Sequence, residues 1–332
     1  MAEISFGFAT SHGSLLVTNP EDWTGRANAD RKSSALWFRG KTHSFQELLE
    51  LRGAESFAAQ AALETRRERY ASCQSQLDRL SDVVLDLDPD LIVIIGDDQH
   101  EWFTESVQPP FAMFCGESVT NFAMTDKEIE RHRSSGRPID PLGYHPPSDM
   151  RCPIAQPLAK HMLRMLAQEG FDVAASMRQP EANLGHAYGF IYRRILRDRA
   201  IPCVPILVNT FYEPNQPTAA RCLDFGHALG RAIRSWPSQA KVAICASGGL
   251  SHFVIDEEFD RLVLTALATN DLATLAAQSD NMFQSGTSEI KNWLIAAGAM
   301  AETSLRMTLL DYVPCYRTEG STGNAMGFAI WQ

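Results

Sequence analysis

Short apolar runs recur along the chain, and turn-forming residues bound each of them. Runs of this kind are typical of strands buried in a sheet, so we expect a strand at each position. The expected strands are residues 4–9, 91–95, 111–114, 173–175, 204–208, 242–246 and 325–330.

Between these runs, apolar residues recur with the period of a helix. The expected helices are residues 44–85 (continuous or broken), 154–169, 185–200, 217–236, 257–269 and 288–302. Strands that alternate with helices predict an α/β fold, with helices flanking a central mixed or mostly parallel sheet.

Residues 118–150 depart from this alternation because they are polar and contain several prolines and glycines. We expect a solvated excursion from a single domain that spans residues 1–332. A lid over a functional site is the alternative for this segment.

Composition narrows the class of protein. Hydrophobic residues make up 45% and charged residues 21%, as in ordinary globular proteins. The formal net charge of −10 argues against a nucleic-acid partner, which needs clustered Lys and Arg. The start of the chain does not resemble a signal peptide, and no apolar stretch is long enough to span a membrane. We therefore expect a soluble cytoplasmic protein that binds neither membranes nor nucleic acid.

The cysteines give no sign of a disulfide framework. There are seven, they are scattered, and none forms a C-x-x-C pair. Reduced, mostly buried thiols are expected in place of disulfides or a zinc cage.

Polar residues that follow the expected strands are the first candidates for chemistry, because ligands of open α/β sheets bind beyond the carboxyl ends of strands. His12 follows the first strand, and the sequence GDDQHE follows the strand at residues 91–95. His252 ends the glycine-rich SGGLSH after residues 242–246, and Glu289 opens a helix. These four places are the candidates for a functional site.

The residue types at these places allow metal and proton chemistry. His12 and Glu289 offer the imidazole and carboxylate that suit iron(II), manganese or zinc, although a Glu in a first helical turn also fits a capping role. His252 titrates in the range of a proton shuttle. His186, at a helix start, is as easily structural as functional. Ser251 as a hydrolase nucleophile is disfavoured, because GGLSHF lacks the G-x-S-x-G elbow.

Other candidates are weaker. Asp97 and Asp98 should face opposite ways if the strand continues, so they do not form a convincing acid/base pair. The remaining histidines are interpreted as ordinary residues of helices or of the polar excursion: His43, His132, His145, His161 and His227. Spacing by itself therefore gives only a weak prediction of a metal site.

Longer motifs connect these residues to a known family. They are SHGSLL, PDLIVIIGDDQHEWF followed by PPFAMF, GGLSH, SEIKNWLIAAGAM and GNAMGFAIWQ. In this order they resemble the class III extradiol dioxygenases, typified by the catalytic subunit of protocatechuate 4,5-dioxygenase, over nearly the whole chain. VNTFYEPNQPTAARCLDFG and SGGLSHFVIDEEFDR are similar to 3-O-methylgallate 3,4-dioxygenases.

The resemblance implies a role for each candidate residue. His12 matches the first metal-ligand histidine, and Glu289 matches the ligand carboxylate. His252 matches the acid/base histidine, and His186 matches a further histidine near the substrate. Thr322 falls near the position at which the family contacts a substituent of the substrate ring. The implied cofactor is iron(II).

The second ligand histidine of the family is where this chain departs from the pattern. In the family it ends a strand with Asn-Asp-His, and an ungapped match of residues 89–103 places Gln99 there. Either His100 becomes the ligand after a shift of one residue, or Gln99 supplies an oxygen. The two are not equivalent, because a one-residue slip reverses the face of a strand. His100 is preferred, since imidazole is the better ligand for iron(II).

The activity implied by the resemblance is extradiol cleavage of a catecholic aromatic acid with dioxygen, as in the catabolism of lignin-derived aromatics. Protocatechuate, gallate and 3-O-methylgallate are the substrate types. A homo-oligomer is expected, with a small separate subunit as the alternative. The Gln99 departure keeps open a catalytically silent relative that binds a metal or a partner protein. A metal-dependent hydrolase is a weaker third hypothesis.

Overall fold

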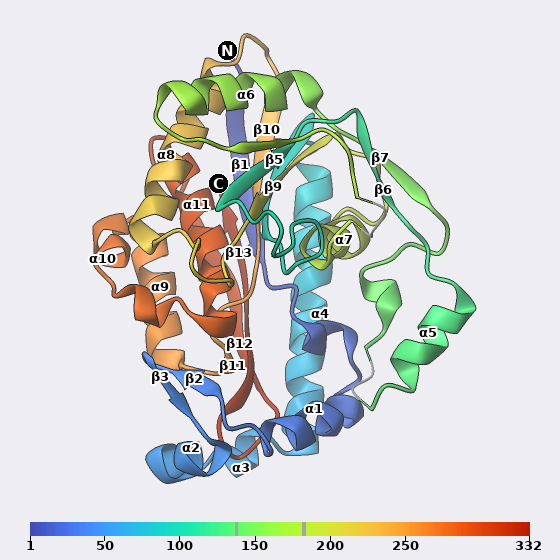
Figure 1. Cartoon of the computed structure of the whole chain (residues 1–332), viewed down its shortest axis with the longest axis vertical. Coiled ribbons are helices and arrows are strands. Elements are labelled where there is room, and N and C mark those ends of the chain that lie inside the picture. The colour runs from blue at the N-terminus through green and yellow to red at the C-terminus, as the bar shows by residue number, and fades with distance from the viewer. Residues whose placement is uncertain (137–138, 181–183) are drawn as a thin grey trace.

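A sheet of nine strands runs through the middle of the molecule (Figure 1). The computed structural model describes residues 1–136, 139–180 and 184–332. Eight strands follow one another in the order β11 (His252–Val254), β13 (Thr322–Trp331), β1 (Glu3–Thr10), β10 (Lys241–Ser247), β4 (Leu91–Asp97), β9 (Cys203–Val208), β5 (Phe111–Phe114) and β8 (Ala174–Ser176). The ninth, β12 (Met307–Tyr316), pairs with β13.

The strands at the centre of the sheet are parallel. β1 pairs with β10, β10 with β4 and β4 with β9 in parallel register, whereas β13 and β5 are antiparallel to their neighbours β1 and β9. Every residue of β4 is buried, as expected for a parallel strand covered on both faces. The predicted single α/β domain with a mixed, mostly parallel sheet is confirmed.

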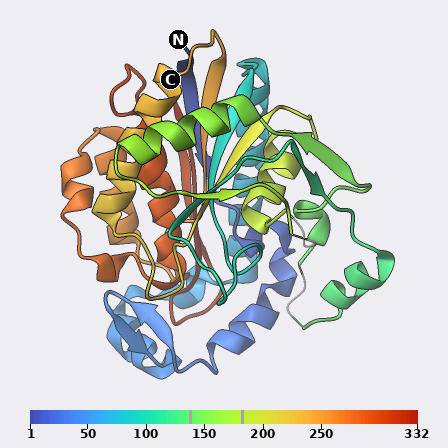
Figure 2. The same ribbon diagram turned by 45° about the horizontal axis from the view of Figure 1, so that its top comes forward.

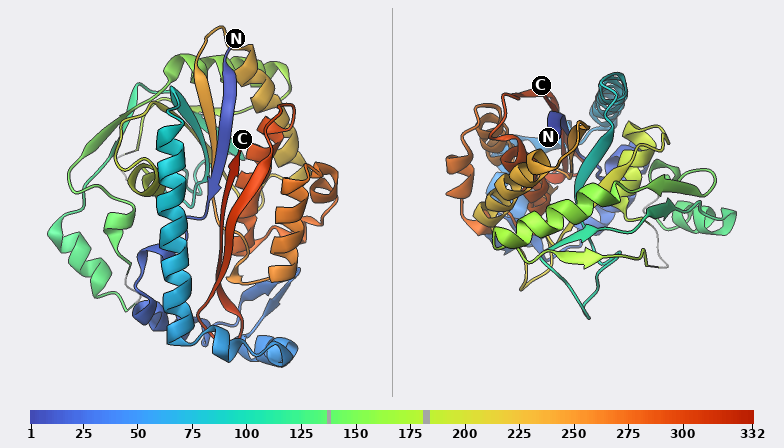
Figure 3. Two further views of the ribbon diagram at one scale, coloured as in Figure 1. Left: turned by 180° about the vertical axis from the view of Figure 1, so that it is seen from behind. Right: turned by 90° about the horizontal axis from the view of Figure 1, so that it is seen from above.

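Helices cover both faces of the sheet (Figure 3). One face carries α6 (Gln156–Gln168), α8 (Ala219–Ser235), α9 (Glu257–Ala268) and α11 (Ile290–Met300). The other carries α4 (Leu63–Asp86) and α7 (His186–Phe190), which continues into a π-helical turn (Ile191–Ile195). Successive residues of β4 alternate between the two cores, because strand side chains point to opposite faces in turn.

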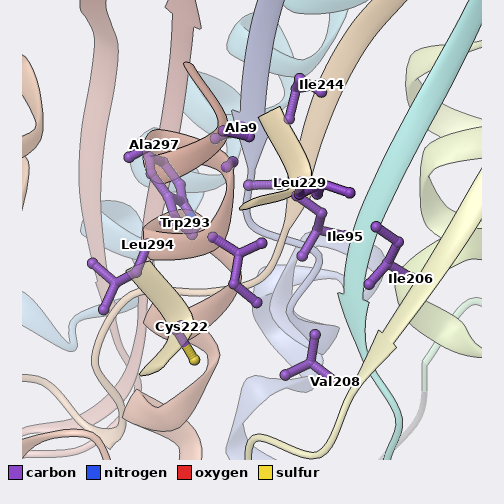
Figure 4. Close-up of a cluster of buried hydrophobic side chains, with 14 of the residues drawn as sticks. Ala9, Ile95, Ile206, Val208, Cys222, Leu229, Ile244, Trp293, Leu294 and Ala297 are labelled. Carbon is purple, nitrogen blue, oxygen red and sulfur yellow. The ribbon is translucent and has the colours of Figure 1, made fainter. Parts of the chain in front are cut away.

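In the larger hydrophobic core, α8 packs directly against α11. Figure 4 shows part of it, with Cys222 and Leu229 from α8 beside Trp293 and Leu294 from α11 and Ile95 from β4. The two helices approach closely because glycines face each other across the contact. A Cβ atom on Gly226 would lie 2.3 Å from the carbonyl oxygen of Ile295. This packing fixes the start of α11, where Glu289 lies.

All seven expected strands and all six expected helical segments appear in the structure, with shifted ends. Residues 44–85 are broken into α2 (Phe45–Arg52), α3 (Phe57–Gln60) and α4. Outside residues 118–153, the α-helices and strands that were not expected are α1 (Trp23–Asp30), β2 (Leu36–Phe38), β3 (Lys41–His43), α10 (Leu272–Ala276), the short strand β11 and the long strand β12. β12 was missed because it is an edge strand in which Asp311 and Pro314 interrupt the apolar pattern.

The polar segment 118–150 has regular structure of its own. β6 (Ser118–Asn121) pairs with β7 (Met150–Pro153), and α5 (Asp126–Arg133) lies at the outer edge of the molecule (Figure 2). Residues 137–138 of this segment lie outside the described part of the chain. In the described part, no helix has the length and apolar character needed to cross a bilayer. All seven cysteines are free and buried.

Candidate metal centre and active-site pocket

Donor side chains from four separate parts of the sequence meet at the carboxyl ends of the central strands. His12 lies two residues beyond β1, and Asp97 is the last residue of β4. Glu289 immediately precedes α11, and His186 begins α7. One ligand atom from each of these four side chains lies within 4.8 Å of the others. Such a set of imidazoles and carboxylates can hold a divalent metal ion.

The hydrogen bonds of His12 assign its ring proton. The hydroxyl of Ser247 donates to the carbonyl of Ala187 over 2.7 Å, so it accepts from Nδ1 of His12 over 2.9 Å. In the neutral imidazole the lone pair is therefore on Nε2. This buried atom makes no hydrogen bond to any described residue, and it lies 3.3 Å from Glu289 Oε2 and 3.7 Å from Asp97 Oδ1. A lone pair held in this way is the usual state of a metal-ligating histidine.

Glu289 is buried and connects the candidate metal centre to His252. Its Oε2 accepts the backbone N–H of Gly249 over 2.6 Å, and its Oε1 lies 3.1 Å from Nε2 of His252. Burial pushes the pKa of this carboxyl upward, but the imidazoles of His252 and His12 outweigh it and hold the pKa well below its ordinary value. Glu289 is therefore an anion at neutral pH.

His252 is held so that it can carry a proton beside Glu289. Its Nδ1 donates to the carbonyl of Leu250 over 2.8 Å, which leaves Nε2 facing Glu289. Burial lowers the pKa of the imidazole, but the Glu289 carboxylate, the Leu250 carbonyl and Asp97 together raise it by more, so the net shift is upward. The proton exchanged by this residue is the one on Nε2.

Asp97 lies near both His12 and His186, and Gln99 contacts Asp97 and Glu289. Asp97 is fully buried, and burial together with the nearby Glu289 raises its pKa. Its Oδ1 accepts from the Asn292 amide over 3.2 Å, and its Oδ2 accepts from the Gln99 amide over 3.0 Å. Gln99 also donates to Glu289 Oε1 over 3.3 Å. One amide group thus bridges the two carboxylates.

His100 points elsewhere, so the preference for it as the second nitrogen ligand finds no support in this geometry. Its backbone is left-handed, with φ of 60°, and its ring stacks on Tyr212 with centroids 3.5 Å apart and planes inclined by 4°. Asp98 also turns away and accepts the backbone N–H groups of Trp102 and Phe103. Asp97 and Asp98 face opposite ways, as the strand alternation predicts.

His186 is oriented by Glu101, a residue that the sequence did not single out. Glu101 accepts both the backbone N–H of His186 (2.8 Å) and its Nδ1 (2.9 Å). Burial opposes protonation of the imidazole, but Glu101, together with Asp97 and Glu289, outweighs burial and raises the pKa of His186 to about 10. Nε2 of His186 remains 3.7 Å from Asp97 Oδ2. His186 is therefore a fixed, positively charged member of the site.

His12, His186 and Glu289 of this cluster form the floor of a cavity of about 410 Å³, and the fully buried Asp97 is not among the residues that line it. The segment 118–150 supplies part of the wall through Asn121, Ile139, Tyr144 and His145. The other side chains that complete the wall are Ser14, Arg26, Leu184, Phe253 and Asn324. The hydroxyl of Tyr144 donates to the backbone carbonyl of His12 over 3.0 Å, which ties this wall to the floor. His145, interpreted as ordinary from the sequence, lies in the wall.

Thr322 does not line this cavity. Its hydroxyl pairs with Thr318 over 2.7 Å and donates to Asp30 over 2.5 Å. The cavity residue of β13 is Asn324, whose backbone lies opposite His252 and whose amide oxygen accepts from Arg317 over 3.0 Å. The expected contact from Thr322 to the substrate therefore finds no support here, and Asn324 is the better candidate in this strand.

The fold and the cluster together define a class of protein: an α/β domain with a histidine and carboxylate site at the carboxyl ends of parallel strands. The family model described as the catalytic LigB subunit of aromatic ring-opening dioxygenase matches residues 59–322. The chain belongs to this family. Asp97, Gln99, His186, His252 and Glu289 fall inside the match, and His12 precedes it.

Known relatives are similar to this chain at low identity. Gallate dioxygenase of Pseudomonas putida is 30% identical over 198 residues, which cover 54% of this chain and 52% of that protein. A 2,3-dihydroxyphenylpropionate/2,3-dihydroxicinnamic acid 1,2-dioxygenase of Comamonas testosteroni is 26% identical over 166 residues, covering 49% and 43%. The chain thus spans about half the length of these curated relatives. The solved structure of the uncharacterized protein JW3007 from Escherichia coli K12 is a distant likeness, with 16% identity over 76% of this chain and 91% of that one and a TM-score of 0.46.

Proposed function

We propose that this protein is an iron(II)-dependent extradiol dioxygenase that opens the ring of a catecholic aromatic acid with dioxygen. One observation carries the proposal: Nε2 of His12, which makes no hydrogen bond to a described residue, lies close to the buried carboxylates of Asp97 and Glu289, and His12 and Glu289 line a cavity, in a chain of the ring-opening family. His12 and Glu289 are the proposed metal ligands. Iron(II) bound there would supply a Lewis-acidic, redox-active centre with positions left open for substrate and dioxygen.

The proposed role of His252 is proton transfer. Because Leu250 fixes Nδ1, Nε2 is the atom that takes a proton from a substrate hydroxyl and later returns it. Nε2 of His252 lies beside Glu289, a proposed metal ligand, and would therefore be close to a substrate bound to the metal. His186, locked by Glu101, would place a positive charge beside a substrate oxygen that has lost its proton.

The cavity suits a small aromatic acid. Its floor is polar, whereas Leu184 and Phe253 offer apolar surface for a ring. Arg26 brings a guanidinium to the same wall and would face a carboxylate group. Protocatechuate, gallate and 3-O-methylgallate are the proposed substrate types, in keeping with the hydroxylated aromatic acids that the relatives' names denote.

Oxygen uptake by the iron(II)-reconstituted protein tests this proposal. The three compounds are expected to consume oxygen, and benzoate, which lacks the hydroxyl pair, is the control that should not. Iron content is measured in the same samples. A protein that holds iron and turns over no catecholic compound would contradict the proposal, and poor iron loading would favour the catalytically silent relative.

A further inference from the structure

Asp97 is the donor in the cluster for which the family pattern provides no role. It lies at the end of β4, two residues before the position that the family fills with its second ligand histidine. Its carboxylate nevertheless faces the unpaired Nε2 of His12, with Oδ1 at 3.7 Å. Its ligand atom and those of His12 and Glu289 all lie within 4.8 Å of one another.

Two carboxylates buried side by side require a positive charge between them. Asp97 is fully buried and Glu289 nearly so, and burying such groups without a counter-charge is costly. In the described part of the chain, neither carboxylate pairs with a lysine or arginine; the basic groups beside them are the imidazoles of His12, His186 and His252, which are charged only when protonated. A divalent cation held between the two would balance both negative charges.

The two residues considered for the second ligand have other contacts. The His100 ring lies flat against Tyr212. Gln99 turns its amide nitrogen towards Asp97 and Glu289, because the opposite assignment would set its oxygen against two carboxylate oxygens. An amide nitrogen in that position donates hydrogen bonds and has no lone pair for a metal. The Gln99 amide thus donates hydrogen bonds to both carboxylates and bridges them.

Asp97 is also oriented by α11. Asn292 lies three residues after Glu289, so both side chains share a face of the helix. The Asn292 amide donates to Asp97 Oδ1 (3.2 Å) and to the carbonyl of Ser247 (2.8 Å). Outer hydrogen bonds of this kind are what hold a ligating carboxylate in place. The E-I-x-N-W motif therefore provides Glu289 and also the residue that orients Asp97.

We propose that Asp97 is the third protein ligand of the metal, so that one histidine and two carboxylates (His12, Asp97 and Glu289) replace the two-histidine, one-carboxylate set. Gln99 and Asn292 are positioning residues for Asp97. The proposal rests on the proposed function only in assuming that a divalent metal binds here.

Metal titration of the apoprotein tests this assignment without substrate or oxygen. Free manganese(II) is followed by electron paramagnetic resonance as it is added to the wild type and to three variants. Asp97→Asn keeps the shape of the side chain and removes its charge, and it should weaken binding by at least about 100-fold. Asp98→Asn, the same change one residue later, and His100→Asn should bind as the wild type does. Circular dichroism checks the fold of each variant.

Unchanged affinity in a folded Asp97→Asn variant would overturn the proposal, and so would a large loss in His100→Asn. These results stand apart from the test of activity. If the wild type binds manganese(II) through Asp97 but opens no aromatic ring, the ligand assignment holds and the proposed function fails. If it opens rings and Asp97→Asn still binds the metal normally, only the ligand assignment fails.

Discussion

At the scale of single residues, the site depends on hydrogen bonds that decide which atom faces the metal position. The Ser247 hydroxyl keeps the ring proton of His12 on Nδ1, and Glu101 orients the ring of His186. His12, Glu289 and His252 could be singled out from the sequence because each lies at an element end with a motif around it. Glu101 could not, because its partner is 85 residues away and the contact exists only in the folded chain.

The side chains after β4 show a second limit of the sequence. Whether Asp97, Gln99 or His100 faces the cluster depends on where the strand alternation stops: β4 ends at Asp97, and the left-handed backbone of His100 lies beyond that end. Nothing in GDDQHE marks that position. The sequence therefore pointed to this segment, while the side chain that reaches the cluster became clear only from the backbone.

Ser247→Ala is predicted to weaken metal binding without removing any ligand. The lost hydroxyl no longer holds Nδ1 of His12 in the protonated form, so affinity should fall by about 10- to 100-fold. Isothermal titration with manganese(II) measures the change. Ser5→Ala, which removes a hydroxyl that donates to the Val242 carbonyl elsewhere in the sheet, is the matched control. Equal affinity in Ser247→Ala and the wild type would show that the tautomer of His12 is not set in this way.

His252→Gln is predicted to separate turnover from metal binding. Loss of the proton carrier should lower kcat by about 100- to 10,000-fold while the iron content stays that of the wild type. Steady-state oxygen uptake and elemental analysis of the same preparation give the two quantities. If the variant lost its iron, His252 would be a metal ligand and not only a proton carrier.

At the scale of elements, the site depends on close contacts that hold strand ends and helix starts together. The buried parallel strands were predictable, because each is a short apolar run covered on both faces. The approach of α8 to α11 was not, since it follows from glycines whose partners lie far along the sequence. That contact fixes the helix that carries Asn292 and follows Glu289.

Gly226→Ala should therefore destabilise the fold. The added Cβ would lie 2.3 Å from the carbonyl oxygen of Ile295, so the helices would have to move apart. Overpacking of this kind typically lowers the free energy of unfolding by about 1–3 kcal/mol. Urea unfolding measures the free energy of unfolding. Gly53→Ala is the control, because a Cβ there meets no atom within 4 Å. If the two variants were equally stable, the helices would have more room than this packing allows.

At the scale of the whole molecule, stability should depend on pH through Asp260. Its carboxyl accepts hydrogen bonds from Ser251 and Tyr312 beneath the GGLSH turn, and burial raises its pKa from 3.8 to about 7. A raised pKa in the folded state means that the folded protein binds more protons than the unfolded chain. The stability contributed by this group is complete below pH 3.8 and is lost as the pH rises to about 7.

Asp260→Asn tests this dependence. The stability of the wild type relative to the variant should decline between about pH 4 and pH 7 and become constant above that range. Urea unfolding of both proteins at a series of pH values gives the comparison. A difference that stays constant over this range, or that grows with pH, would contradict the raised pKa of Asp260.

The claim that this protein opens aromatic rings is tested most directly with labelled oxygen. The iron(II)-loaded protein is incubated with gallate, protocatechuate or 3-O-methylgallate under isotopically labelled dioxygen, and the products are analysed by mass spectrometry. A ring-opened product that has gained both labelled atoms is the predicted result, and it should be absent with His252→Gln. Oxygen atoms derived from water, or an intact ring after incubation of iron-loaded protein with all three compounds, would contradict the proposed function.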